Sequence, residues 1–453
     1  MQAHSPAEYV LKVEKTSVAK VPTVCYNCYT LRHEVMHVNS EDFRPAMVPP
    51  GELGMKSDTN DIIDAGVARD MADFRIACAS VYAERRGKPF LRRNYGLADR
   101  EANIPLGFGH LFRMASMTKP VIAVCILLER EKGRLDIDDE VSRFLDGYDS
   151  PVVGEYDSGG KLLSTRPASR RIKVRDLLTH SSGLGSGPWF GRDLAAAGVP
   201  EDVDLTKLAE LYAHIPLQFD PGSAFAYSGL AGFDLLAHIV EVTSGQKIED
   251  YLQANICKPL GMRDTTFDPD ETQMKRIVTM YASGKGCMTR VDMGNHVFGK
   301  LPRSYHCGGA GLVSSLDDYA AFARMLTDLS CYRGPRVLSA ESVELLRSVL
   351  LPSSTPGLGH GVAWGASVRV VTEDDGSQRP LKKGAYGWSG AYGTHFWCDP
   401  VREICVVYLS NMTTAGGSGA LTARHIERDI MESIIQTRYH GVNNTIENIY
   451  RQR

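Results

Sequence analysis

The feature that most constrains the fold is a run of consecutive apolar residues at 121–128, directly after the segment 112–120. The helical pattern starts near Ser116 and continues to Glu129, and Gly133 then ends it. A helix that is apolar on nearly every side has to be surrounded by other elements. The run is also too short to span a bilayer, which takes about 20 apolar residues. The sequence therefore predicts a buried helix at the centre of a large globular unit.

Two residues that can carry chemistry, Ser116 and Lys119, lie at the start of this helix. Residues three apart share one helix face, so the serine hydroxyl and the lysine amine are expected to touch. A serine becomes a nucleophile when a base lies within hydrogen-bond reach. The same spacing occurs three more times, at Ser17 and Lys20, at Ser158 and Lys161, and at Ser244 and Lys247. The spacing alone therefore does not identify a site.

The composition is that of an ordinary globular protein of 453 residues, with 43% hydrophobic residues, 23% charged residues and a net charge of -3. The lack of a basic excess argues against nucleic-acid binding, and no apolar window has the length of a membrane span. Residues 1–20 mix charges among apolar residues, unlike a secretory signal, so a cytoplasmic location is expected. The 10 cysteines indicate free thiols in a reducing compartment rather than a disulfide framework.

One group of possible metal ligands lies near the amino terminus, where Cys25 and Cys28 precede His33 and His37. Two thiolates and two imidazoles can form a tetrahedral zinc site. The group stands alone in a polar segment, however, so chance proximity of surface residues is the preferred interpretation. No metal site is predicted.

The predicted elements change in character along the chain. A helix is expected at 62–71, followed by a hairpin of strands at 76–82 and 90–95. The middle is rich in helical patterns, at 174–180, 205–214, 230–242, 248–252 and 316–329. Strands return at 361–371, 386–397 and 403–411, before a last helix at 421–435.

This order predicts an α+β fold, in which both chain ends complete one antiparallel sheet flanked by helices and a helical lobe is inserted between them. We expect an N-terminal extension at 1–56, a catalytic unit at 57–436 and a polar C-terminal tail at 437–453. Within the unit, the sheet lobe takes the ranges 57–135 and 331–436, and the helical lobe takes the range 136–330.

Two downstream segments suggest further chemistry. Tyr227 lies near the end of the turn-rich segment 221–229. Beside the Lys119 cation, the charged form of its phenol would be favoured, and the phenolate could then act as a base for Ser116. The segment 387–393 is rich in glycine inside a strand pattern, which marks close approach of a backbone or ligand. A backbone N–H there, together with that of Ser116, could form an oxyanion hole. Taken singly, Tyr227 and Trp388 fit packing roles equally well.

A catalytic triad is a competing interpretation, because His180 lies beside Ser181 and Ser182. The chain contains no GxSxG pentapeptide, and sequence neighbours rarely face one another. A structural role for His180 is therefore preferred.

Taken together and in this order, the motifs resemble those of the serine β-lactamase and penicillin-binding-protein superfamily. The similarity is to the class C β-lactamase-like branch, which holds family VIII carboxylesterases, D-aminopeptidases and lovastatin-type acyltransferases. It covers residues 60–436 and rests on the motifs 116–119, 227–229 and 388–390, with supporting phrases at 177–184 and 308–312. Of the serine-lysine pairs, only Ser116 and Lys119 have a buried helix behind them and the other two motifs downstream.

The resemblance implies a nucleophilic Ser116, with Lys119 and Tyr227 sharing the proton transfers through an acyl-enzyme. The oxyanion hole would consist of the backbone N–H groups of Ser116 and Ala391, and no cofactor is implied. The residues expected to line the substrate pocket are Trp388, Ser389, Gly390, Tyr392, His395, Trp189 and Phe190.

The chain departs from the lactamase pattern at two positions. Trp388 stands where lactamases have a lysine, so an anionic ligand loses a charged hydrogen bond of about 1.5–3 kcal/mol. Gly229 stands where they commonly have an asparagine, so the side-chain amide that grips a substrate amide is missing. Both changes favour neutral esters or thioesters over lactams.

The leading expectation is therefore hydrolysis of small or medium carboxylic esters. The alternative is a transacylase that moves an acyl group to an alcohol or amine in secondary metabolism, and a D-amino acid amidase or peptidase comes third. A non-enzymatic sensor or scaffold is disfavoured, because all three motifs are present. The sequence predicts no oligomeric state.

Overall fold

The computed structural model describes residues 46–185, 190–199, 202–284, 286–293, 304–327, 335–374 and 379–435. The suggested zinc ligands, most of the N-terminal extension and the C-terminal tail lie outside these ranges. Within them, no three His, Cys, Asp or Glu side chains come together as metal ligands. None of the helices in these ranges is long and apolar enough to cross a bilayer.

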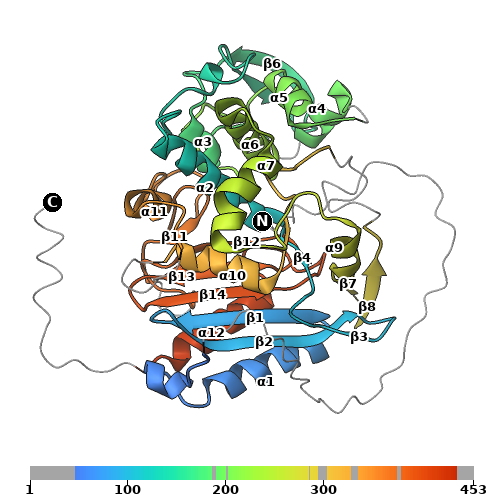
Figure 1. Cartoon of the computed structure of the whole chain (residues 1–453). Coiled ribbons are helices and arrows are strands. Elements are labelled where there is room, and N and C mark those ends of the chain that lie inside the picture. The colour runs from blue at the N-terminus through green and yellow to red at the C-terminus, as the bar shows by residue number, and fades with distance from the viewer. Residues whose placement is uncertain are drawn as a thin grey trace, which may run out of the picture.

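An antiparallel sheet of eight strands forms the base of the molecule (Figure 1). In spatial order its strands are β10 (Val362–Trp364), β11 (Arg369–Val371), β12 (Tyr386–Ser389), β13 (His395–Asp399), β14 (Ile404–Leu409), β1 (Cys78–Arg85), β2 (Lys88–Asp99) and β3 (Ile104–Pro105). The two chain ends meet in the middle of this sheet, where Ser80 pairs with Leu409. The fold is therefore the predicted α+β arrangement, with an antiparallel sheet completed by both chain ends.

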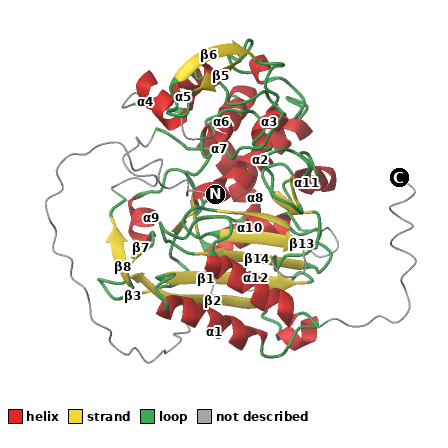
Figure 2. Cartoon of the chain, turned by 180° about the vertical axis from the view of Figure 1, so that it is seen from behind, coloured by secondary structure: helices red, strands yellow, loops and turns green. Residues whose placement is uncertain are grey.

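Helices cover both faces of the sheet (Figures 1 and 2). On one face, α1 (Thr59–Ala72) packs against α12 (Leu421–Ser433). On the other face lie α10 (Leu316–Met325) and, above it, α2 (Thr118–Glu131). Strand β14 is buried at every position because its alternate side chains enter two different cores. This explains why it reads as a continuous apolar run.

The second lobe stands on the sheet lobe and is built mainly of short helices (Figure 1). Its elements are β5 (Val152–Tyr156), β6 (Leu162–Pro167), α3 (Val174–Leu178), α4 (Phe190–Ala197), α5 (Leu205–Ala213), α6 (Ala231–Ser244), α7 (Ile248–Leu252) and α8 (Lys258–Leu260), with a π-helical turn Gln253–Cys257 before α8. Helix α2 packs against α6 and so joins the two lobes. Its predicted burial is confirmed, since all residues from Thr118 to Glu129 are buried.

The remaining elements lie around the sheet. They are the helices α9 (Glu271–Arg276) and α11 (Ala340–Arg347), the strand pairs β4 (Phe112–Arg113) with β9 (Val313–Ser314) and β7 (Met280–Gly284) with β8 (Cys287–Val291), and the 3-10 turn Pro50–Leu53. The 3-10 turn Val141–Arg143 lies instead beside the start of α3, where Val141 N donates to Ile172 O at 2.8 Å. The hairpins β5–β6 and β7–β8 lie within the stretch where only helices were expected. Helix α10 packs on β1 and β14, although its residues fall in the range assigned to the helical lobe.

Two predicted strands are hairpins. The run 361–371 folds back so that Val362 of β10 pairs with Val371 of β11. The run 386–397 turns back on itself, so that Trp388 of β12 pairs with Phe396 of β13. The turn is closed by hydrogen bonds from Gly390 N to Thr394 O at 2.7 Å and from Gly393 N to Gly390 O at 3.1 Å. Glycine 393, with φ of 90°, supplies the left-handed backbone conformation that the turn needs.

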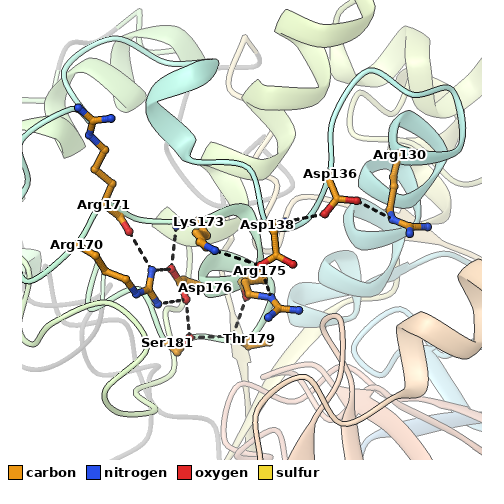
Figure 3. Close-up of polar contacts among 10 residues, drawn as sticks. All are labelled: Arg130, Asp136, Asp138, Arg170, Arg171, Lys173, Arg175, Asp176, Thr179 and Ser181. Carbon is orange, nitrogen blue, oxygen red and sulfur yellow. Dashed lines mark hydrogen bonds and ion pairs between the residues drawn. The ribbon is translucent and has the colours of Figure 1, made fainter.

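A polar network fixes the loop that follows α3 (Figure 3). The buried Asp176 accepts hydrogen bonds from the Arg170 guanidinium at 2.6 and 2.8 Å and from Lys173 N at 2.8 Å. Further along, Ser181 O accepts from Gly222 N at 2.7 Å, and His180 O accepts from Ala226 N at 3.0 Å. The network therefore ties the loop after α3 to the segment that ends in Tyr227.

Candidate active site

Ser116 lies in a single 3-10 turn (Ala115–Met117) that leads directly into α2. The preceding Ala115 has φ of 47°, a left-handed conformation that costs a non-glycine residue free energy. Two hydrogen bonds hold the turn: Tyr319 Oη donates to Met117 O at 2.8 Å, and Leu312 N donates to Thr118 Oγ1 at 3.1 Å. The serine is thus presented on a strained, well-anchored turn at the positive end of a helix.

Lys119 is fully buried beside this serine. Its Nζ lies 3.2 Å from Ser116 Oγ, 2.5 Å from the carbonyl oxygen of Gly229 and 2.7 Å from that of Gly309. All three atoms are neutral hydrogen-bond acceptors, and no carboxylate of the described residues forms an ion pair with the amine. Both glycine carbonyls were missed by the sequence analysis, because a backbone acceptor has no side-chain signature.

The two glycines that supply these carbonyls lie against each other. A Cβ atom on Gly309 would lie 2.8 Å from Gly229 O and 2.8 Å from Leu230 Cα. A Cβ on Gly308 would lie 2.2 Å from Phe233 O. Glycine is therefore required in the segment 308–312, because its backbone packs closely against the start of α6.

Tyr227 lies on the other side of the lysine. Its ring centroid is 5.0 Å from Lys119 Nζ, and its hydroxyl oxygen accepts a hydrogen bond from Trp388 Nε1 at 3.2 Å. The rings of Tyr227 and Trp388 are in contact, with centroids 5.3 Å apart. The structure thus brings the predicted Ser116, Lys119, Tyr227 and Trp388 into one cluster.

His180 lies behind Tyr227, with ring centroids 4.4 Å apart. Its Nδ1 accepts a hydrogen bond from Ser228 N at 3.1 Å, and burial lowers its pKa well below the usual value, helped by the nearby Lys119 charge. Among its neighbours are Phe225 and Trp364. The lone pair of Nδ1 is therefore occupied by the backbone and the ring is a weak base, which does not fit a base for Ser181 or Ser182.

The end of β12 lies against the serine turn. A Cβ on Gly390 would lie 2.3 Å from Met114 O, and Thr394 Oγ1 donates to the same carbonyl at 3.0 Å. The next residue, Ala391, has a backbone N–H that donates no hydrogen bond to any of the described residues. This unpaired donor follows directly on the contact between β12 and the serine turn.

The other predicted pocket residues lie in different places. Ser389 and His395 face each other, with Oγ and Nδ1 2.8 Å apart, and His395 Nε2 lies 2.9 Å from the Glu427 carboxylate of α12. Trp388 and Ser389 are consecutive strand residues, so their side chains lie on opposite faces of the sheet. Trp388 faces the cluster around Lys119, and Ser389 and its partner His395 therefore point away from that cluster. In the structure His395 is thus buried on the α12 side of the sheet.

Three more residues complete the predicted pocket set. Phe190 begins α4 and contacts the ring of Tyr212, with centroids 5.6 Å apart. Tyr392 is part of the β12–β13 turn. Burial raises the pKa of its phenol, and the nearby Arg113 offsets only part of this rise. Trp189 lies outside the described residues.

Comparisons with known proteins agree with this architecture. The family model described as Beta-lactamase matches residues 63–428. Protein Rv1367c of Mycobacterium tuberculosis is 33% identical over 375 residues, which cover 79% of this chain and 89% of that protein. Esterase EstB of Burkholderia gladioli is 30% identical over 384 residues, which cover 80% of this chain and 92% of the esterase.

Among solved structures, EstCE1, a hydrolase with promiscuous acyltransferase activity, has a TM-score of 0.69 at 24% identity. The match covers 83% of this chain and 98% of EstCE1, and at this identity it shows the fold. The chain belongs to the beta-lactamase family. It is a serine hydrolase or acyltransferase of the esterase and acyltransferase branch.

Proposed function

We propose that the protein hydrolyses small or medium carboxylic esters through an acyl-enzyme on Ser116. The observation that carries this proposal is the position of the buried Lys119 amine, 3.2 Å from Ser116 Oγ. A serine and a base within hydrogen-bond reach are the minimum for nucleophilic catalysis. The similarity to Esterase EstB supports an ester as the substrate.

The contacts of Lys119 fit a base. A neutral amine has two N–H groups and one lone pair, whereas carbonyl oxygens only accept. If the two N–H groups donate to Gly229 O and Gly309 O, the lone pair is left for the Ser116 hydroxyl. As Ser116 Oγ attacks the ester carbonyl, its proton passes to Lys119 Nζ, and the ammonium then has three acceptors. Tyr227, whose ring centroid lies 5.0 Å from Lys119 Nζ and whose hydroxyl contacts Trp388, would pass a proton on to the leaving alcohol.

The negative charge that develops on the ester oxygen needs preorganised donors. The backbone N–H groups of Ser116 and Ala391 fit this role, because β12 lies against the serine turn and the Ala391 N–H has no acceptor among the described residues. Removal of one such donor in other hydrolases costs about 2.7–4 kcal/mol of transition-state stabilisation.

The chemistry of Trp388 favours neutral substrates. In place of a lysine it offers one neutral N–H donor, which is already directed at Tyr227, and an apolar face. Around it lie Trp364, with ring centroids 4.6 Å apart, and Tyr227. An apolar acyl or alcohol group of a substrate can therefore pack against these rings, whereas a substrate carboxylate finds no cationic partner in Trp388.

Acyl transfer to an alcohol is the second candidate. The same acyl-enzyme serves both reactions, and the fold is shared with EstCE1, a hydrolase with promiscuous acyltransferase activity. The difference lies in whether water or a bound alcohol reaches the acyl carbon.

The proposal is tested with Ser116→Ala and a p-nitrophenyl ester. We expect turnover to fall to background while circular dichroism and the melting temperature stay close to those of the wild type. Retained turnover in the folded variant would refute the serine mechanism. In the same assay, an added alcohol that diverts product from free acid to a new ester would favour the acyltransferase over the hydrolase.

A further inference from the structure

A buried carboxylate that the proposed mechanism does not use lies close to the site. Asp234 of α6 is 1% exposed, and its Oδ2 accepts hydrogen bonds from Tyr305 Oη at 2.7 Å and from Tyr212 Oη at 3.1 Å. A buried carboxylate costs free energy unless hydrogen bonds or an opposite charge compensate it. A buried carboxylate at Asp234 therefore indicates a structural or functional role that offsets this cost.

Asp234 is connected to both carbonyls that hold Lys119. Gly229 lies just before α6, the helix that carries Asp234. Gly309 follows Tyr305 in a tight segment, in which Cys307 N donates to Tyr305 O at 3.1 Å and Ala310 N donates to Cys307 O at 3.2 Å. The hydrogen bond from Tyr305 to Asp234 therefore fastens the segment that presents Gly309 O to α6.

The groups that face Asp234 define its charge. They are Tyr212 from α5, Lys119 from α2, and Tyr305, Cys307 and the Gly309 N–H from the loop. Burial raises the pKa of Asp234 to about 6, while the two phenol hydroxyls and the Lys119 charge act to lower it. Burial also raises the pKa of Tyr212, Tyr305 and Cys307, so these three stay neutral. Lys119 is the one cation in this set.

We propose that Asp234 is a positioning residue for Lys119: through Tyr305 it fixes the Gly309 carbonyl, and its charge offsets the ammonium that forms during acylation. This inference rests on the proposed function. The proton transfers stay those among Ser116, Lys119, Tyr227 and the leaving alcohol, and Asp234 neither gives nor takes a proton. A carboxylate in this position stabilises the charged form of a neighbouring amine without touching the substrate.

The test compares Asp234→Asn and Tyr305→Phe with Tyr148→Phe as a matched control. Tyr148 is a buried tyrosine of the same lobe whose hydroxyl donates to Ala209 O at 2.7 Å; among the described residues it forms no hydrogen bond with Lys119, Asp234 or Tyr305. We expect kcat to fall about 10- to 100-fold in the first two variants with KM within about twofold, as for loss of a hydrogen bond to a charged group. In Tyr148→Phe, kcat should stay within about twofold of the wild type.

The pH profile supplies a second readout that a purely structural role would not change. As Asp234 ionises, wild-type kcat should rise through an inflection near pH 6, and Asp234→Asn should lack this inflection. If Asp234→Asn does not fold, Tyr305→Phe and its control decide the matter. The inference is overturned if the folded variants match Tyr148→Phe in kcat and keep the inflection. If Ser116→Ala retains turnover, it is the proposed function that fails.

Discussion

Lys119 shows how a buried amine can be held without a direct counter-charge. Its three partners, the Ser116 hydroxyl and the carbonyls of Gly229 and Gly309, are all neutral. An ammonium here is held by neutral acceptors and has no direct ion pair among the described residues, which is why the proposed role of Asp234 is to offset its charge. The geometry therefore suits an amine that receives the Ser116 proton during the reaction. The serine-lysine spacing is visible in the sequence, but the partners are backbone atoms that only the fold brings together.

The ionisation of Asp234 should also be visible in stability. Its pKa in the folded state is about 6, against 3.8 when unfolded, so the folded state holds the proton more tightly. The free energy of unfolding therefore falls as pH rises from 3.8 through 6. Since Asp234→Asn lacks this titration, its stability relative to the wild type should increase by roughly 1–2 kcal/mol between pH 5 and pH 7, measured by urea unfolding.

Asp220→Asn is the control for this titration. Hydrogen bonds from Arg166 lower the pKa of the partly exposed Asp220 from 3.8 to about 2, so its contribution to stability is lost only as pH falls from 3.8 through 2. The stability difference between Asp220→Asn and the wild type should stay constant from pH 5 to pH 7. A constant difference for Asp234→Asn as well would contradict the assigned titration.

At the scale of elements, the proposed oxyanion hole depends on the contact between β12 and the serine turn. Gly390 allows the two backbones to touch, since its missing Cβ would lie 2.1 Å from Thr394 Oγ1 and 2.3 Å from Met114 O. Gly390→Ala should push the strand end away from Ser116. We expect kcat to fall at least about tenfold and stability to fall by about 1–3 kcal/mol, as for overpacking.

The matched control for this substitution is Gly359→Ala. Gly359 is exposed, and a Cβ there would meet only Val362 Cγ2, at 3.8 Å. Kinetics with a p-nitrophenyl ester and thermal unfolding of both variants would separate the two positions. Equal effects at Gly390 and Gly359 would show that close approach at β12 does not matter for catalysis.

The helices and strands also show which elements can be predicted from sequence patterns alone. Helix α2 was predicted because its apolar surface is complete, and the β1–β2 hairpin because its turn at Arg86 and Gly87 is polar. The β12–β13 hairpin was read as one strand, because its turn at 390–394 contains neither proline nor asparagine and lies between two buried strands. The hairpins β5–β6 and β7–β8 were missed for a different reason: their strands are short and partly exposed, so they show no clear apolar pattern.

For the whole molecule, the site depends on how the two lobes meet. Ser116 and Lys119 come from the helix that joins the lobes, whereas Tyr227, Gly229 and Gly309 approach from the helical lobe and Trp388 from the sheet. Their order in the sequence suggested a shared site, but their distances depend on packing across the molecule. His395 illustrates the limit, because the strand register and Glu427, which lies far along the chain, determine the side of the sheet on which it lies.

The most direct test of the account is to locate the acyl-enzyme. We predict that intact-mass analysis after treatment with a fluorophosphonate shows a single adduct, that peptide mapping places it on Ser116, and that Ser116→Ala forms none. Lys119→Met should form the same adduct far more slowly. An adduct on Ser181 or Ser182, or none on the folded wild-type protein, would contradict the central claim.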